Sequence, residues 1–176
     1  MKETEVKFEV KSLKPVAEKL KAMGGSLVWK GSEESWFFDT PKQTLRRAGK
    51  MVRLRDWQGH SKTLTLKTAP EKISTKYKVR NEYEVKIENL GIMERILKEL
   101  GLVEAFKYKK YREHWALPGA SVELDKIAGR YFVEIEAPEK TINDLASRLG
   151  LSWDTATTQS YFFIINSARG NGKRRT

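Results

Sequence analysis

Charged residues recur at every second position in one segment after another of this 176-residue chain. Glu3, Glu5 and Lys7 begin the pattern, and Glu134 and Glu136 repeat it near the other end. Segments between them carry Arg53 and Arg55, Thr65 and Lys67, Arg80, Glu82 and Glu84, Lys110 and Arg112, and Glu123 and Asp125. Successive side chains of a β-strand point to opposite faces, so the charges of each segment share one face. The pattern therefore predicts many strands whose charged faces carry both signs.

The alternation of apolar and polar residues divides the chain into about eight strands. They are expected at residues 3–10, 26–38, 51–57, 62–68, 77–87, 103–116, 120–126 and 130–137. Helical spacing and end signals predict helices in the connections and at the end of the chain. These helices are expected from a cap at Ser12 to Met23, from a cap at Asn89 to Leu100, at 141–149 and at 158–168. A short basic connection is expected at 42–50.

Short turns join most of the predicted strands, which favours antiparallel pairing. Eight antiparallel strands can close into a barrel whose interior holds side chains or one small ligand. An open sheet with one solvated face would show the same alternation. The residue pattern alone leaves both arrangements open.

Composition limits the classes of protein to which the chain can belong. The absence of Cys excludes disulfides and thiol chemistry and fits a reducing cytosol, so we expect a cytoplasmic protein. No apolar run approaches the length of a membrane span and no signal-peptide pattern opens the chain, so no membrane association is expected. The net charge of +11 favours anionic partners. Residues 1–168 are predicted to form one domain, and 169–176 a disordered basic tail.

The charged faces have two interpretations. In the first, they are the solvated side of a sheet, paired as ordinary surface ion pairs. In the second, they converge on one cavity, where arginines such as Arg53 offer planar forks that suit phosphate oxygens. The pairs Glu3 and Glu5, and Glu134 and Glu136, bring like charges together, which disfavours ionisation unless a cation lies between them. Hard oxygen ligands of this kind suit Mg²⁺ or Mn²⁺, so converging faces would hold a divalent cation and a phosphate chain.

Weaker signals add little to this choice. His114 lies on the same alternating side as Lys110 and could enter the site, although a satisfied or exposed histidine is the commoner case. Residues 36–38 could stack a ligand ring, but core packing is favoured. Residues 46–50 could guide an anion or form a solvated loop. Gly24 and Gly25 indicate a helix stop, and no phosphate-loop, nucleophile-elbow or kinase signature is present.

In their order along the chain, these motifs resemble the CYTH domain, the family of class IV adenylyl cyclases and thiamine triphosphatases among the triphosphate tunnel metalloenzymes. The resemblance covers residues 1 to about 165 and includes residues 37–41, Gly129, Ser160 and Tyr161 besides the charged pairs. It implies an α+β fold built on an eight-stranded antiparallel β-barrel, open as a tunnel, with flanking helices. Two segments depart from the family pattern, at 33–37 and at 127–131, and they leave the organic part of the substrate open.

The resemblance also implies roles for individual residues. The metal ligands would be Glu3, Glu5, Glu134 and Glu136, with Asp125 nearby. The triphosphate would be held by Lys7, Arg53, Arg55, Lys67, Arg80, Lys110 and Arg112. The remaining acids would orient these bases or support a second ion, namely Glu82, Glu84 and Glu123.

The function implied is metal-dependent phosphoryl or nucleotidyl transfer from a small-molecule triphosphate, with Mg²⁺ or Mn²⁺ as cofactor. A class IV adenylyl cyclase would convert ATP to cyclic AMP and pyrophosphate. The alternative is a triphosphatase acting on thiamine triphosphate, tripolyphosphate or a nucleoside triphosphate, and a second alternative is a non-catalytic module that binds polyphosphate or RNA. A nucleic-acid partner is disfavoured because such a surface has no use for so many carboxylates. Lys7 would act as a general base only if its neighbours lower its pKa, and a monomer or homodimer is expected.

Overall fold

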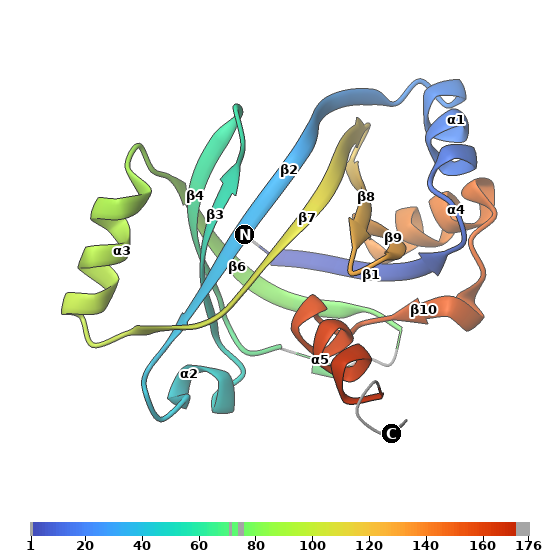
Figure 1. Ribbon diagram of the computed structural model, residues 1–176. Coiled ribbons are helices and arrows are strands. Elements are labelled where there is room, and N and C mark those ends of the chain that lie inside the picture. The colour runs from blue at the N-terminus through green and yellow to red at the C-terminus, as the bar shows by residue number, and fades with distance from the viewer. Residues whose placement is uncertain (1, 71, 74–75, 172–176) are drawn as a thin grey trace.

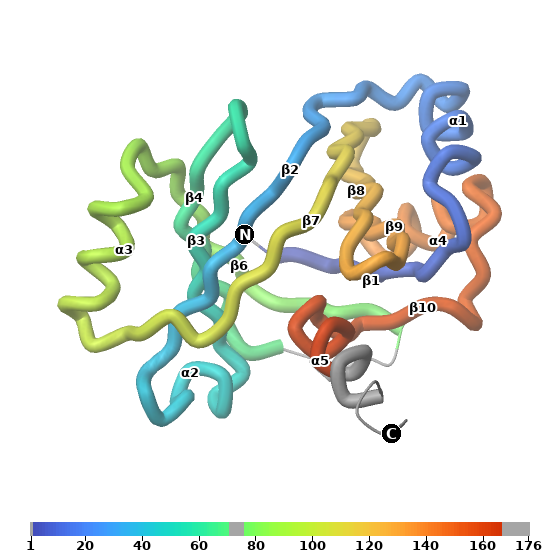
Figure 2. Tube along the Cα trace, in the orientation of Figure 1, coloured from blue at the N-terminus to red at the C-terminus, as the bar shows by residue number. Residues whose placement is uncertain are grey.

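The computed structural model describes residues 2–70, 72–73 and 76–171 (Figures 1 and 2). Within these residues, eight strands form the walls of an antiparallel barrel: β1 (Lys2–Val10), β2 (Ser26–Asp39), β3 (Met51–Trp57), β4 (Ser61–Lys67), β6 (Lys78–Lys86), β7 (Val103–Leu117), β8 (Ala120–Ile127) and β9 (Arg130–Glu136). Their order around the barrel is β1-β9-β8-β7-β2-β3-β4-β6, and β6 pairs back onto β1. The predicted antiparallel barrel is confirmed, and the open sheet is excluded.

The barrel closes where β1 pairs with a different strand on each side. Glu5 lies opposite Glu136 of β9, and Glu3 lies opposite Arg80 of β6. Two short strands extend the sheet outside the closed ring: β5 (Lys72–Ile73) pairs with β6, and β10 (Ala156–Thr157) pairs with β1. The longest pair, β2 with β7, runs side by side across the middle of the molecule (Figure 2).

Helices cover the outer face of the barrel on two opposite sides (Figure 1). On one side, α1 (Lys14–Ala22) and α4 (Glu139–Leu149) pack with the outward residues of β1, β8 and β9 in the largest apolar core. On the other side, Leu97 of α3 (Leu90–Glu99) packs with Phe38 and Leu54 of β2 and β3. Among the helices within the described residues, none is both long and apolar enough to cross a bilayer.

Two further helices lie near one end of the barrel. They are α2 (Thr44–Arg47), between β2 and β3, and α5 (Tyr161–Asn171), at the end of the described chain (Figure 1). A 3₁₀ turn, η1 (Trp153–Thr155), leads into β10. Tyr161 and Ile165 of α5 pack with Phe132 of β9 in a separate apolar cluster, which fixes α5 against the barrel.

The helix ends correct several expectations. Leu13, and not Ser12, is the N-cap of α1, and no side chain caps this end. Pro15 occupies the first turn, where a missing N–H costs nothing. Asn89 caps α3 as predicted, since its side chain accepts a hydrogen bond from the backbone N–H of Ile92. The connection at 42–50 contains α2, and α5 includes residues 169–171 of the expected tail, whereas 172–176 lie outside the described residues.

Candidate active site

The barrel surrounds a cavity of about 1270 Å³, and most of the charged residues singled out by the alternation line it. All seven predicted basic residues line it: Lys7, Arg53, Arg55, Lys67, Arg80, Lys110 and Arg112. Four of the five predicted metal ligands line it as well, namely Glu3, Glu5, Glu134 and Glu136. Asp125 is fully buried behind them and does not reach the cavity. The charged faces therefore converge, and the interpretation as a solvated outer surface is wrong.

Strand β3 shows how the sequence builds this lining. Arg53 and Arg55 point into the cavity, whereas Leu54 between them is buried in the apolar core under α3. Burial of a side chain the size of leucine contributes about 1.5–3 kcal/mol, and this packing fixes the strand from its outer face. The two guanidinium groups are consequently held by a rigid element and not by a loop.

Lys67 joins the strands where the barrel closes. Its Nζ lies 2.5 and 2.6 Å from the two carboxylate oxygens of Glu3 on β1, and 2.7 Å from Oε2 of Glu82 on β6. Burial alone would lower the pKa of Lys67, but Glu5 and Glu3 raise it above the usual value. Lys67 is therefore a buried cation with two carboxylate partners.

Lys7 has the same character on the other side of β1. Its Nζ lies 2.7 Å from Oε1 of Glu134 and 3.4 Å from Oε1 of Glu5. Burial favours the neutral amine, but these two carboxylates outweigh it and raise the pKa of Lys7 above its usual value. Burial likewise favours a neutral Glu5, yet Lys7 lowers the pKa of that carboxyl to about 2. The condition for Lys7 to be a general base, a lowered pKa, is not met.

Asp125 organises the most buried group of charges. Its two oxygens accept hydrogen bonds from Nε and Nη2 of Arg112 at 2.7 and 2.6 Å, in a bidentate pair. Lys110 Nζ lies 3.1 Å from Oδ2, and the hydroxyl of Tyr161 donates to the same oxygen at 2.6 Å. Burial raises the pKa of Asp125, but Arg112 and Lys110 lower it further than burial raises it. With these partners, Asp125 anchors two bases and α5.

Three arginines of the cavity have an N–H donor that no described group accepts. The Nε atoms of Arg53, Arg55 and Arg80 are buried without a hydrogen-bond partner. Arg80 as a whole is only 7% exposed, and it forms no ion pair with any described residue. Unsatisfied buried donors are costly, so these three positions show that the described acids do not satisfy all the N–H groups of the cavity wall.

Glu136 is an acid of the cavity that lacks a basic partner. This carboxylate lines the cavity and forms no ion pair within the described part of the chain. Burial, together with the negative charges of Glu3 and Glu123, raises its pKa to about 8. A carboxyl in such surroundings gains a counter-charge either from a proton or from a cation.

The carboxylate oxygens near Glu136 are suitable ligands for a hard divalent cation. Glu3, Glu5 and Glu136 supply only oxygen ligands, as Mg²⁺ and Mn²⁺ prefer. Among the described residues, however, no three acidic or histidine side chains are gathered at ligating spacing. Lysines hold two of these acids, Lys67 at Glu3 and Lys7 at Glu5. A cation would therefore bind as the carboxylates exchange lysine contacts for metal contacts.

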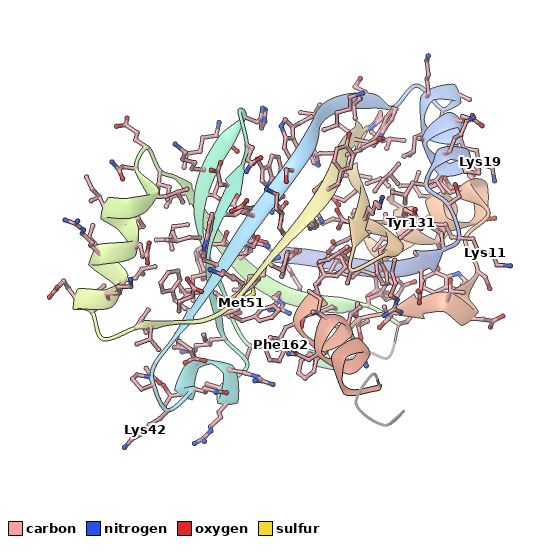
Figure 3. The ribbon with its side chains drawn as sticks, viewed as in Figure 1. Lys11, Lys19, Lys42, Met51, Tyr131 and Phe162 are labelled. Atoms are coloured by element: carbon pink, nitrogen blue, oxygen red, sulfur yellow. The ribbon has the colours of Figure 1, made fainter. Side chains whose placement is uncertain are left out.

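The cavity also contains residues whose sequence signals are weaker. His114 enters it, and its Nδ1 lies 2.9 Å from Oε1 of Glu123. Phe37 lines the cavity beside Phe106, and Phe38 contributes to the lining as well although it packs with Leu54 and Leu97 in the apolar core. Phe162 of α5 lines the same space and is labelled in Figure 3. One mouth of the cavity is thus aromatic.

Glu33 is the functional candidate that sequence reasoning missed. It is fully buried on β2 beside Lys110, Arg112 and Arg55, and these bases lower its pKa to about 2 although burial opposes the shift. The signal is present, because Glu33, Ser35 and Phe37 continue the two-residue alternation of the other strands. In the sequence, that segment stands out only as a departure from the family pattern.

The shifted pKa values predict a stability maximum near pH 5. Glu5 and Glu33, with pKa values of about 2, contribute stability that is present above their unfolded pKa near 4.5 and is lost as the pH falls toward 2. The loss between pH 5 and pH 3 is about 2 kcal/mol for each group. Glu136, with its pKa of about 8, makes stability decline as the pH rises from 4.5 to 8. Urea unfolding of the metal-free protein from pH 3 to pH 9 tests this, and a maximum above pH 7 would contradict it.

Comparisons with known proteins agree with this architecture. The CYTH domain matches residues 1–155. A protein of Methanocaldococcus jannaschii, named as a candidate adenylate cyclase, is 28% identical over 172 residues, covering 92% of this chain and 97% of that protein.

Two solved structures show the same fold. One from Vibrio parahaemolyticus, also named as a candidate adenylate cyclase, has a TM-score of 0.82 at 23% identity and covers 93% of this chain and 97% of that chain. One from Hippeastrum, described as a candidate adenylyl cyclase with a dominant triphosphatase activity, has a TM-score of 0.66 at 19% identity, with coverage of 94% and 96%.

Proposed function

Because the chain belongs to the CYTH family, we propose that it is a metal-dependent enzyme that transfers a phosphoryl or nucleotidyl group from a small-molecule triphosphate. The first assignment is an adenylyl cyclase-type reaction, in which a ribose hydroxyl of ATP attacks the α-phosphorus and pyrophosphate leaves. The name of the relative from Methanocaldococcus jannaschii supports this assignment.

The observation that carries the proposal is that basic and acidic side chains line the same cavity inside the barrel. The side chains of Arg53, Arg55 and Arg80 line the space in which a phosphate chain would lie. The unpaired carboxylate of Glu136 faces the same space. A triphosphate with its divalent cation presents the complementary charges to both kinds of side chain.

The residues of this chain would act mainly by positioning and charge stabilisation, which dominate phosphoryl transfer. The bases would hold the phosphate chain and offset the negative charge that develops on the leaving phosphate. Glu3, Glu5 and Glu136 would hold the cation, which polarises phosphoryl oxygens when bound. Lys7, whose pKa is raised, would contribute a positive charge and not a proton acceptor.

Hydrolysis is a second candidate for the same site. The description of the Hippeastrum protein, a dominant triphosphatase activity under a cyclase name, motivates it. In this reaction water attacks the terminal phosphorus of thiamine triphosphate, tripolyphosphate or a nucleoside triphosphate. Both reactions need the same bases and the same cation, so their products must be measured separately.

The test is a panel of ATP, GTP, thiamine triphosphate and tripolyphosphate with Mg²⁺ or Mn²⁺. Cyclic nucleotide and orthophosphate are quantified in parallel, and chelation of the metal is expected to abolish both. Arg80→Met is expected to lower kcat/KM by about 100-fold, as loss of a charge-stabilising donor does in other enzymes.

The matched control is Arg130→Met. Arg130 forms its ion pair with Glu9 and does not line the cavity, so turnover should stay at the level of the parent protein. Metal-independent binding of tripolyphosphate without turnover of any substrate would contradict the enzyme assignment and favour the polyphosphate-binding module.

A further inference from the structure

Glu33 is a buried acid in the middle of the basic wall of the cavity. It lies on β2, which pairs with β7 on one side and with β3 on the other. Its side chain is fully buried, and it does not line the cavity. It therefore cannot contact a ligand directly and acts only through its neighbours.

Those neighbours are bases of the two flanking strands. Lys110 Nζ of β7 lies 3.4 Å from Oε1 of Glu33, and Arg112 Nε, on the same strand, lies 3.7 Å from Oε2. Arg55 Nη1 of β3 lies 3.9 Å from Oε2. One carboxylate thus stands behind three phosphate-binding candidates that come from two strands.

The two carboxylate oxygens of Glu33 differ in their hydrogen bonds. Oε1 accepts a hydrogen bond from the hydroxyl of Ser35 at 3.2 Å, whereas Oε2 is buried without any hydrogen-bond partner. A buried carboxylate oxygen that lacks a hydrogen bond costs free energy. The carboxylate is therefore held mainly by the charges of the three bases, and hydrogen bonds satisfy only one of its two oxygens.

We infer that Glu33 is a positioning residue, which fixes the directions in which Arg55, Lys110 and Arg112 present their N–H groups to the bound phosphate chain. This inference rests on the proposed function, because it assigns these bases to a triphosphate. The negative charge of Glu33 also repels the bound phosphate chain. Glu33 therefore lowers the affinity for the phosphate chain while it orients the three bases. Removal should consequently affect binding and turnover in opposite directions.

The experiment compares Glu33→Gln with Glu34→Gln, which removes the same charge from the next residue. Glu34 lies on the outer face of β2 and pairs with Lys109, so it provides a matched control. Tripolyphosphate binding is measured without metal by calorimetry, and kcat is measured with the best substrate of the panel. Melting temperatures are recorded so that both assays are made on folded protein.

For Glu33→Gln we expect tripolyphosphate to bind several-fold more tightly, while kcat falls by about 10- to 100-fold, the range that misplacement of catalytic groups produces. Glu34→Gln should match the parent in both measurements. Parent-level kcat in folded Glu33→Gln would overturn the inference, as would a loss of kcat and affinity together in proportion to the folded fraction.

The double variant Glu33→Gln with Ser35→Asp keeps the test open if the single variant does not fold. Glu33→Gln removes the negative charge beside Lys110 and Arg112. Ser35→Asp places a negative charge two residues further along the same face of β2. We expect folded protein whose kcat stays at least about tenfold below that of the parent. Full recovery of kcat would show that net charge, and not position, is the relevant property.

The inference and the proposed function can fail separately. If the parent protein turns over no triphosphate, the proposed function fails. The inference then stands on binding, and identical tripolyphosphate affinities and enthalpies for parent and Glu33→Gln would overturn it.

Discussion

Glu136→Gln is expected to lower turnover by about 100-fold or more while the protein becomes more stable. Loss of a metal-binding carboxylate removes affinity for the cation, and even indirect contacts to metals are worth about 10- to 100-fold. Stability rises because Glu136 faces the negative charges of Glu3 and Glu123, and its pKa of about 8 records the cost of ionising it there. At pH 8 the gain should be on the order of 2 kcal/mol, since glutamine carries no charge to be repelled.

The measurement pairs a turnover assay with urea unfolding of the metal-free protein at pH 8. Glu9→Gln is the control, because Glu9 pairs with Arg130 and does not line the cavity. That variant should keep parent turnover. The site assignment is wrong if Glu136→Gln retains the parent rate with Mg²⁺ or Mn²⁺.

Asp125→Asn is expected to have the largest effect on stability. The substitution leaves Arg112 and Lys110 buried beside a neutral amide, whereas they now share a carboxylate at 2.6–3.1 Å. Breaking a buried charge pair costs about 3–5 kcal/mol. That loss is a large part of the roughly 5–15 kcal/mol by which domains are stable.

Chemical unfolding at pH 7 measures this cost, and Tyr161→Phe provides the scale. The phenylalanine variant removes only the hydroxyl that donates to Asp125, so we expect a loss of about 1 kcal/mol. A cost below that of Tyr161→Phe would show that Asp125 does not anchor the basic wall.

The strand faces could be predicted from the sequence because a β-strand has a fixed period of two. Arg53 and Arg55 must share a face whatever the fold, and the same holds for Glu134 and Glu136. Closure of the barrel did not follow from this period. It depends on the pairing of β1 with β6, a contact between residues more than 70 positions apart that leaves no local pattern.

The partner of each charge was equally beyond local reasoning. Nothing in the sequence shows that Lys67 binds Glu3 or that Asp125 lies behind Arg112, because these pairs depend on register between strands. The metal assignment illustrates the consequence. Acids at two-residue spacing suggest a ligand set, whereas the structure places lysines against Glu3, Glu5 and Glu134 and leaves Glu136 alone unpaired among the described acids of that set.

Pairing of the first strand with β9 has a consequence for synthesis on the ribosome. Residues of β1 leave the exit tunnel more than 120 residues before their partners at 131–136. The ring cannot close until β9 has also been translated, and such distant contacts slow folding. During that interval the acidic and basic segments of the nascent chain have not yet formed ion pairs. Their charged side chains are then hydrated, and this hydration keeps the nascent chain soluble.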